Sequence, residues 1–224
     1  MNFELIIFDL DGTLTDTLAD ITDITNKVLS VLGYPLHSQT EYKYFVGNGL
    51  KNLVIKSLPE SARTEDIIEK GYEKVLIEYT NTPVNKTKLY DGISELLYLL
   101  ESKKIKKAIL SNKADPITKK ICEKLLSEWC FEIIIGANGK FPRKPDPTSA
   151  LYIANTLGIN PENILYVGDS GVDMETALRA GFTSVGVTWG FRKKEELIEN
   201  GAKHIISHPV ELIEILEIED ENKN

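Results

Sequence analysis

The sequence has few cysteines, no excess of positive charge and no long apolar run. Cys122 and Cys130 are its only cysteines and do not form a Cys-x-x-Cys pair, which argues against a disulfide framework and favours a reducing compartment. The net charge of -8 argues against nucleic-acid binding through phosphates. No stretch reaches the roughly 18 apolar residues of a membrane span, and no signal-peptide pattern opens the chain. We therefore expect a cytoplasmic protein that binds neither nucleic acid nor membrane.

The apolar residues that are present indicate an α/β fold. Hydrophobic residues make up 42% of the 224 residues, enough for a core and against disorder. The run Leu5–Phe8 predicts a strand buried on both faces. Further strands are predicted over 107–111, 131–135, 164–167, 183–188 and 204–207. Helices are predicted over 93–100, 115–129, 147–157, 172–180, 193–199 and 210–216. This alternation predicts a Rossmann-like parallel sheet covered by helices on both faces, with a frayed tail from Glu217.

A helical block interrupts this pattern after the first strand. Apolar spacing predicts helices over 17–32, 50–58 and 64–79, and residues 17–85 contain no convincing strand. Gly33 ends the first of these helices. We therefore expect a helical cap of residues 17–85, inserted into a core made of residues 1–16 and 86–224.

Polar side chains follow four of the predicted core strands. They are Asp9 and Asp11, then Ser111 with Asn112 and Lys113, then Arg143 with Lys144, and finally Asp169 with Asp173. Each cluster alone also fits a solvated loop or a polar turn. Because the carboxyl ends of parallel strands lie on one edge of a sheet, we expect the clusters to converge there. Their joint occurrence at corresponding strand ends favours a functional site.

The residue types in these clusters indicate phosphoryl chemistry. Asp9, Asp169 and Asp173 offer carboxylate oxygens with no histidine or thiolate nearby in sequence, a set that suits Mg²⁺. Lys144 can hold a phosphoryl oxygen or a nucleophilic carboxylate, and Ser111 adds a hydroxyl. One carboxylate can form an aspartyl-phosphate while a second, two residues on, protonates the leaving oxygen.

The motifs resemble those of the haloacid dehalogenase-like superfamily of phosphotransferases. Residues 9–14 (Asp-Leu-Asp-Gly-Thr-Leu) are similar to its first motif, Ser111-Asn112 to the second, Lys144-Pro145 to the third, and Gly168-Asp169 with Asp173 to the fourth. The resemblance implies a Rossmann-like core with an inserted cap. It also implies that Asp9 is the nucleophile and Asp11 the general acid and base. Ser111, Asn112 and Lys144 would then bind the phosphoryl group. Mg²⁺ would be held by the Asp9 carboxylate, the Asp11 backbone carbonyl and Asp169, with Asp173 as a ligand or a supporting residue.

Further segments resemble phosphoglycolate phosphatase-like members of this superfamily. They are Asp16-Thr17 with Asp20-Ile21, residues 46–50 and residues 188–191. In the cap loop, Gly47 and Asn48 are expected to contact a small anionic leaving group, because glycine lets backbone amides approach closely; a turn that only links two helices is the alternative. The expected substrate is a small phosphorylated metabolite, with 2-phosphoglycolate as the first candidate. A pyrophosphatase, a sugar-phosphate or nucleotide phosphatase, and a β-phosphoglucomutase-like mutase stay open as alternatives. Monomer and homodimer are both compatible with the sequence.

Overall fold

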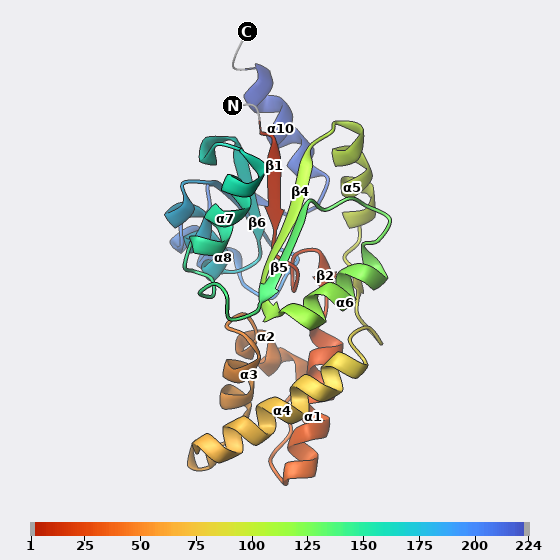
Figure 1. Cartoon of the computed structure of the whole chain (residues 1–224), viewed down its shortest axis with the longest axis vertical. Helices are drawn as coiled ribbons and strands as arrows, with labels where there is room; N and C mark the ends of the chain where they lie inside the picture. The colour runs from red at the N-terminus through yellow and green to blue at the C-terminus, as the bar shows by residue number, and fades with distance from the viewer. Residues whose placement is uncertain (1–2, 222–224) are drawn as a thin grey trace.

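The computed structural model describes residues 3–221, and its centre is a six-stranded sheet (Figure 1). The strands lie in the order β5-β4-β1-β6-β7-β8, and every neighbouring pair is parallel. Their bounds are β1 Leu5–Phe8, β4 Lys106–Ala114, β5 Ile133–Ala137, β6 Ile164–Gly168, β7 Thr183–Val187 and β8 His204–Ile206. The predicted Rossmann-like parallel sheet is confirmed.

Helices cover both faces of this sheet because its strands carry apolar side chains on alternate sides. Ile6 and Phe8 of β1 belong to one buried cluster, and Leu5 and Ile7 to the other. The first cluster is completed by α5 (Ile93–Ser102), α6 (Asp115–Leu125) and α10 (Glu211–Glu221). The second is completed by α7 (Thr148–Leu157) and α8 (Gly171–Ala180). A short helix, α9 (Lys194–Glu199), lies beside β7.

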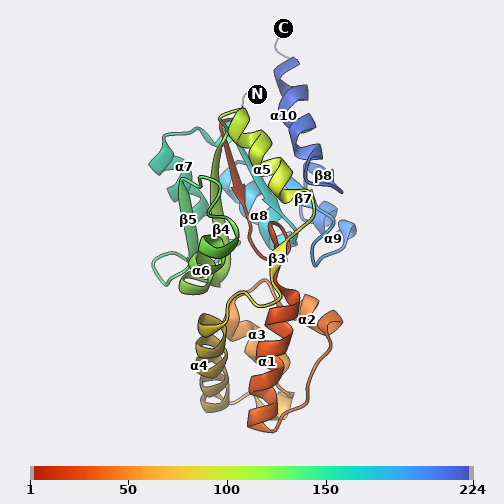
Figure 2. The same ribbon diagram turned by 90° about the vertical axis from the view of Figure 1, so that its right-hand side faces the viewer.

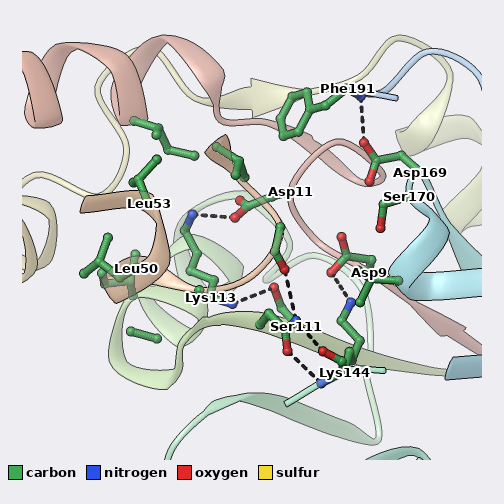
Figure 3. A pocket seen from close by; sticks show the side chains of 18 of the residues that line it. Asp9, Asp11, Leu50, Leu53, Ser111, Lys113, Lys144, Asp169, Ser170 and Phe191 are labelled. Atoms are coloured by element: carbon green, nitrogen blue, oxygen red, sulfur yellow. Dashed lines mark hydrogen bonds and ion pairs between the residues drawn. The ribbon is translucent and has the colours of Figure 1, made fainter. Parts of the chain in front are cut away.

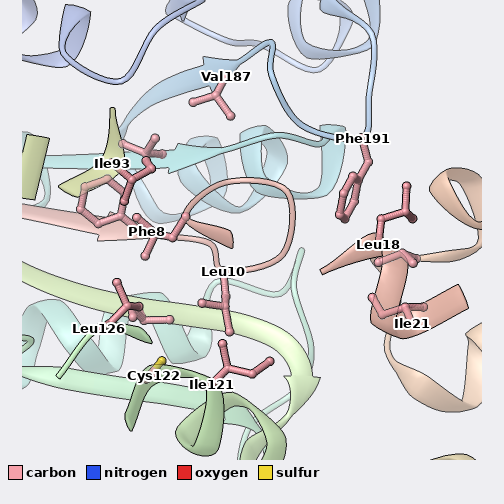
Figure 4. Packing of buried hydrophobic residues seen from close by; sticks show 14 of the residues in the cluster. Phe8, Leu10, Leu18, Ile21, Ile93, Ile121, Cys122, Leu126, Val187 and Phe191 are labelled. Atoms are coloured by element: carbon pink, nitrogen blue, oxygen red, sulfur yellow. The ribbon is translucent and has the colours of Figure 1, made fainter. Parts of the chain in front are cut away.

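Four helices form a separate group beyond the carboxyl ends of the strands (Figures 1 and 2). They are α1 (Leu18–Leu32), α2 (Gln39–Phe45), α3 (Leu50–Ser57) and α4 (Glu65–Asn81). A short antiparallel pair, β2 (Thr15–Asp16) with β3 (Lys88–Leu89), joins this group to the sheet. Leu18 and Ile21 of α1 approach Phe191 of the core (Figure 4), so one apolar cluster runs through both parts.

The second connection to the helical group is fixed by a buried carboxylate. Asp20, in the first turn of α1, accepts hydrogen bonds from the backbone N–H groups of residues 85–87 and from the Thr87 hydroxyl, over 2.6–3.0 Å. Burial opposes ionisation of Asp20, but these hydrogen bonds outweigh it and lower its pKa. The entering helix and the returning chain are therefore tied together at the boundary of the group.

Several local elements differ from the sequence expectation. Helix α2 was not predicted, although Ser38 and Glu41 form a complete capping box at its start. Strand β4 extends to Ala114, beyond the predicted 107–111, and α6 ends at Leu125 rather than 129. Helix α10 continues to Glu221, beyond the predicted 210–216; fraying from Glu217 stays a prediction, and residues 222–224 lie outside the described part. Among residues 3–221, no helix combines the length and the apolar character needed to cross a membrane.

Candidate active site

The four polar clusters meet around one cavity at the carboxyl edge of the sheet (Figure 3). The cavity has a volume of about 50 Å³. Core residues that line it are Asp9, Asp11, Ser111, Asn112, Lys113, Lys144 and Asp169. Because these side chains come from four separate strand ends, the fold itself assembles the site.

Three carboxylates and one lysine form the buried centre of the site. Asp9, Asp169 and Asp173 each offer an oxygen, and these atoms lie within 4.8 Å of one another. Lys144 Nζ lies 2.8 Å from Asp9 Oδ1 and 2.7 Å from Asp173 Oδ1, and it also donates to the Leu110 carbonyl at 3.0 Å. The Lys144 side chain is only 3% exposed. A single buried cation therefore bridges two of the three acidic groups.

The titration of these groups reflects an excess of buried negative charge. Burial raises the pKa of Asp9 to about 7, although the charge of Lys144 opposes the rise. Burial also raises the pKa of Asp169 well above its ordinary value, and the charges of Asp173 and Asp9 add to that effect. Burial alone would lower the pKa of Lys144, but the charges of Asp173 and Asp9 raise it well above its ordinary value. One lysine does not neutralise three carboxylates, so the centre favours a further cation.

The surroundings of Asp169 leave room for backbone only. A Cβ atom on Gly12, whose φ is +86°, would lie 2.2 Å from Asp169 Oδ2, and one on Gly190 would lie 2.3 Å from Asp169 Cβ. The backbone N–H of Phe191 donates to Asp169 Oδ2 at 2.6 Å. Glycine is therefore required on both sides of this carboxylate for steric reasons.

Asp173 is oriented from two directions. Its Oδ2 accepts from the Ser170 hydroxyl at 2.6 Å and from the Ser170 backbone N–H at 3.2 Å, while Oδ1 faces Lys144. This arrangement is a capping box at the start of α8. The same contacts that begin the helix therefore hold a carboxylate in the acidic centre.

Asn112 connects the site to the helical group. Its Nδ2 donates to the carbonyls of Gly47 and Lys144, each at 3.0 Å, and its Oδ1 accepts from the Lys144 backbone N–H at 2.9 Å. Both amide hydrogens are thus in use, so a phosphate contact by Asn112 would compete with these bonds. Ser111 lines the cavity, and its Oγ accepts from the Lys113 backbone N–H at 3.2 Å.

Sequence alone assigns no role to Lys113, yet this residue contacts the predicted acid and base directly. Lys113 Nζ lies 2.6 Å from Asp11 Oδ2 (Figure 3), and its side chain is 5% exposed. Burial would lower the pKa of Lys113, but Asp11 and Tyr79 together outweigh burial and raise it. The adjacent Ser111-Asn112 pair was the available signal, because it places position 113 at the same strand end.

Residues of the helical group close the other side of the cavity. Gly47, Leu50, Leu53 and Tyr79 line it, together with apolar neighbours. Asn48, which was predicted to contact a leaving group, is exposed and is not among the lining residues. The cavity wall contributed by this group is therefore mainly apolar side chains and glycine backbone.

A core arginine joins these two walls. Arg192 Nη2 donates to the Val46 carbonyl at 2.7 Å, and Nη1 donates to the Lys43 carbonyl. Its Nε lies 3.6 Å from Glu196 Oε1. Arg192 thus binds the carboxyl end of α2 while it lines the cavity, so its guanidinium is already engaged.

The acidic centre fits a bound divalent cation. Its donors are buried carboxylate oxygens close together, with no sulfur or imidazole in the cluster, a donor set that suits Mg²⁺ rather than zinc. The raised pKa values of Asp9 and Asp169 indicate that a positive charge at this place would stabilise the ionised site.

Comparisons with known proteins give a consistent assignment. Residues 6–187 match the family model described as haloacid dehalogenase-like hydrolase. A phosphoglycolate phosphatase from Aquifex aeolicus is 33% identical over 213 residues, covering 95% of this chain and 96% of the relative. A phosphoglycolate phosphatase from Nitrosococcus oceani is 30% identical over 216 residues, covering 95% of this chain and 96% of the relative.

A solved structure agrees with these sequence matches. The crystal structure of a predicted phosphoglycolate phosphatase from Haemophilus somnus superposes with a TM-score of 0.89 at 27% identity. The match covers 96% of this chain and 98% of the other. The chain belongs to the haloacid dehalogenase-like hydrolase family, in which it is a phosphoric monoester hydrolase similar to phosphoglycolate phosphatases.

Proposed function

We propose that this phosphatase uses Mg²⁺ and an aspartyl-phosphate on Asp9 to hydrolyse a small phosphomonoester, with 2-phosphoglycolate as its substrate. The observation that carries the proposal is the position of Asp9. Its carboxylate follows β1, is buried against Lys144, and shares a cluster with Asp169 and Asp173. A carboxylate held in this way can attack phosphorus without first reorganising.

In the first step, an Asp9 carboxylate oxygen attacks the phosphorus atom and forms an acyl phosphate. The bond between phosphorus and the ester oxygen breaks, and that oxygen takes the proton of the Asp11 carboxyl group. The alcohol then leaves. Lys144 keeps Asp9 in position and offsets part of the negative charge that gathers on the phosphoryl oxygens.

In the second step, a water molecule attacks phosphorus while the Asp11 carboxylate accepts its proton. The bond between phosphorus and Asp9 breaks, which releases inorganic phosphate and restores both carboxyl groups. Ser111 would donate its hydroxyl to a phosphoryl oxygen in both steps. Asn112 would act by keeping the Lys144 loop and the cap loop together.

Asp9, the Asp11 carbonyl and Asp169 would hold Mg²⁺, with Asp173 supporting them through Lys144 and Ser170. When bound, this ion supplies a positive charge that neutralises the carboxylates and the phosphoryl group. Phe191 and Gly12 keep Asp169 in place for this role.

A small substrate is favoured by the size and the walls of the cavity. Leu50, Leu53 and Tyr79 of the helical group close its other side at a volume of about 50 Å³, so a large leaving group would require this group to move. Residues 17–85 would act as a cap that closes over such a group and excludes water, with Gly47 and Asn48 near its entrance. The names of the relatives from Nitrosococcus and Aquifex make 2-phosphoglycolate the first substrate to test.

The test is phosphate release with Mg²⁺ from a panel of 2-phosphoglycolate, pyrophosphate, glucose 6-phosphate and AMP. β-Glucose 1-phosphate, with isomer formation measured beside phosphate release, covers the mutase alternative. We expect the highest kcat/KM for 2-phosphoglycolate and no turnover in EDTA. Asp9→Asn should lower the rate by more than about 10³-fold, whereas Asp91→Asn, at an exposed turn before α5, should keep it. A higher kcat/KM for another substrate would replace 2-phosphoglycolate, and a normal rate in Asp9→Asn would exclude the mechanism.

A further inference from the structure

Lys113 is a buried cation whose partner is needed elsewhere during the reaction. Its ammonium group donates to Asp11 Oδ2 at 2.6 Å and lies 4.5 Å from the centre of the Tyr79 ring, and Tyr79 together with Asp11 raises its pKa. Since an ammonium group carries three N–H donors, this group keeps donor capacity toward the cavity that it lines. On the other side of the pair, Asp11 Oδ1 is buried and has no hydrogen-bond partner among residues 3–221.

The other cations of the cavity wall are already committed. Lys144 is held by two carboxylates and a carbonyl, all of which belong to the catalytic centre. The Arg192 guanidinium donates hydrogen bonds to two carbonyls of the helical group and forms an ion pair with Glu196. Among the described cavity-lining residues, Lys113 is therefore the cation whose carboxylate partner, Asp11, is needed elsewhere during the proposed reaction.

The proposed reaction separates Lys113 from its present partner. Asp11 can protonate the ester oxygen only when its carboxyl group points at that atom rather than at Lys113. A buried ammonium that loses its counter-charge is strongly disfavoured. A neutral leaving group offers no replacement, so Lys113 would pull Asp11 back. A leaving group with its own carboxylate offers a replacement close to the place that Asp11 vacates.

We propose that Lys113 is the specificity-determining residue of this phosphatase and binds a carboxylate on the leaving group of the substrate. The proposal deepens, and rests on, the function proposed above. Substrate binding becomes an exchange of partners: the substrate carboxylate replaces Asp11 on Lys113, and the released Asp11 carboxylate takes up a proton from solvent, which it then donates to the ester oxygen. The same exchange then explains both the selectivity for acidic leaving groups and the movement of Asp11 to the ester oxygen.

The dimensions of 2-phosphoglycolate agree with this exchange. Its carboxylate carbon is two bonds from the ester oxygen, so the two groups can contact Lys113 and Asp11 side by side. The walls around Lys113 are apolar on the cap side, where Leu50, Leu53 and the Tyr79 ring lie. In such surroundings a charge-assisted hydrogen bond is stronger than it would be in water.

The experiment compares two substrates of equal length, 2-phosphoglycolate and 2-hydroxyethyl phosphate, which carries an alcohol in place of the carboxylate. The quantity measured is the ratio of their kcat/KM values in the presence of Mg²⁺. Lys113→Met should lower this ratio by about 10- to 100-fold, the range of a hydrogen bond to a charged group. The matched control is Lys119→Met, which removes a similar lysine–aspartate pair at a 60% exposed side chain and should keep the wild-type ratio.

Should Lys113→Met fail to fold, Lys113→Gln replaces it, because its amide can still donate to Asp11 but carries no charge. The same fall in the ratio is expected. A ratio that stays within about threefold of wild type, or equal losses on both substrates, would overturn the assignment and leave Lys113 as a support for Asp11 alone. A wild-type enzyme with no preference for 2-phosphoglycolate would instead overturn the proposed substrate.

Discussion

The buried charge of Asp9 should make the metal-free protein less stable than a variant without that charge. The pKa of Asp9 is raised from 3.8 to about 7, so the folded state binds this proton more tightly than the unfolded state does. The contribution of Asp9 to stability is therefore full below about pH 4 and is lost as the pH rises through 7. At 1.36 kcal/mol for each pKa unit, the loss amounts to about 4 kcal/mol above pH 7.

We expect Asp9→Asn to raise the melting temperature Tm in EDTA at pH 8. The full 4 kcal/mol is an upper bound, because an amide attracts Lys144 less than a carboxylate does. With half of it retained, and about 2–4 °C for each kcal/mol in a chain of this size, the gain is at least about 4 °C. At pH 4.5 the gain should fall to about a quarter, because the carboxyl group is then protonated in the folded state and only the unfolded state has ionised.

The assay is thermal unfolding of wild type, Asp9→Asn and Asp91→Asn at both pH values, in EDTA and in Mg²⁺. Mg²⁺ should raise the Tm of the wild type, because a hundredfold excess over its Kd adds up to about 2.7 kcal/mol to the free energy of unfolding. The same addition should raise the Tm of Asp9→Asn by less, and Asp91→Asn should follow the wild type throughout. A lower Tm for Asp9→Asn in EDTA at pH 8, or an equal response of both proteins to Mg²⁺, would refute this reasoning.

Three further outcomes follow from the same geometry. Gly12→Ala should lower activity at least about 100-fold and stability by about 1–3 kcal/mol, because Gly12 has a φ of +86° and the new Cβ would clash with Asp169. Gly33→Ala, at a φ of +78° with open space around it, should lower stability alone. Activity and Tm measured on both variants test this. Asp20→Asn should weaken the tie to residues 85–87 and speed amide hydrogen exchange there, and unchanged exchange would contradict the role of Asp20 in holding this segment. Asp11→Asn should accumulate the acyl phosphate with acetyl phosphate as substrate, because this leaving group needs no proton. The variant is quenched with acid and its mass is measured. If no acyl phosphate is found, Asp11 is not the base proposed for the second step.

The core of the fold could be predicted because its signals are local. The run Leu5–Phe8 is buried on both faces, and the later core strands alternate with helices, two of which, α7 and α8, end at glycines, Gly158 and Gly181. Helix α2 escaped prediction because it has only seven residues, and its apolar side chains are too few to show a period. Its capping box, Ser38 with Glu41, was the readable signal.

The acidic centre was also readable, because topology alone brings parallel strand ends together. Asp9, Lys144 and Asp169 lie where that rule places them. Asn48 shows the limit of the same reasoning. A glycine-bracketed loop indicates a close backbone approach but not the direction of the side chain between the glycines, and here that side chain is exposed. Its predicted contact with a leaving group therefore stays a prediction.

Lys113 could not be assigned from sequence because its environment is made by a part of the chain that is distant from it. A lysine after a serine–asparagine pair is in most proteins a solvated residue. Here Tyr79 of α4 covers its ammonium group, and Asp11 pairs with it from another strand end. Burial turns an ordinary surface charge into one that must be neutralised at every stage of the reaction. Under the proposed function, this demand for a counter-charge at Lys113 is therefore where substrate selection in this chain can arise.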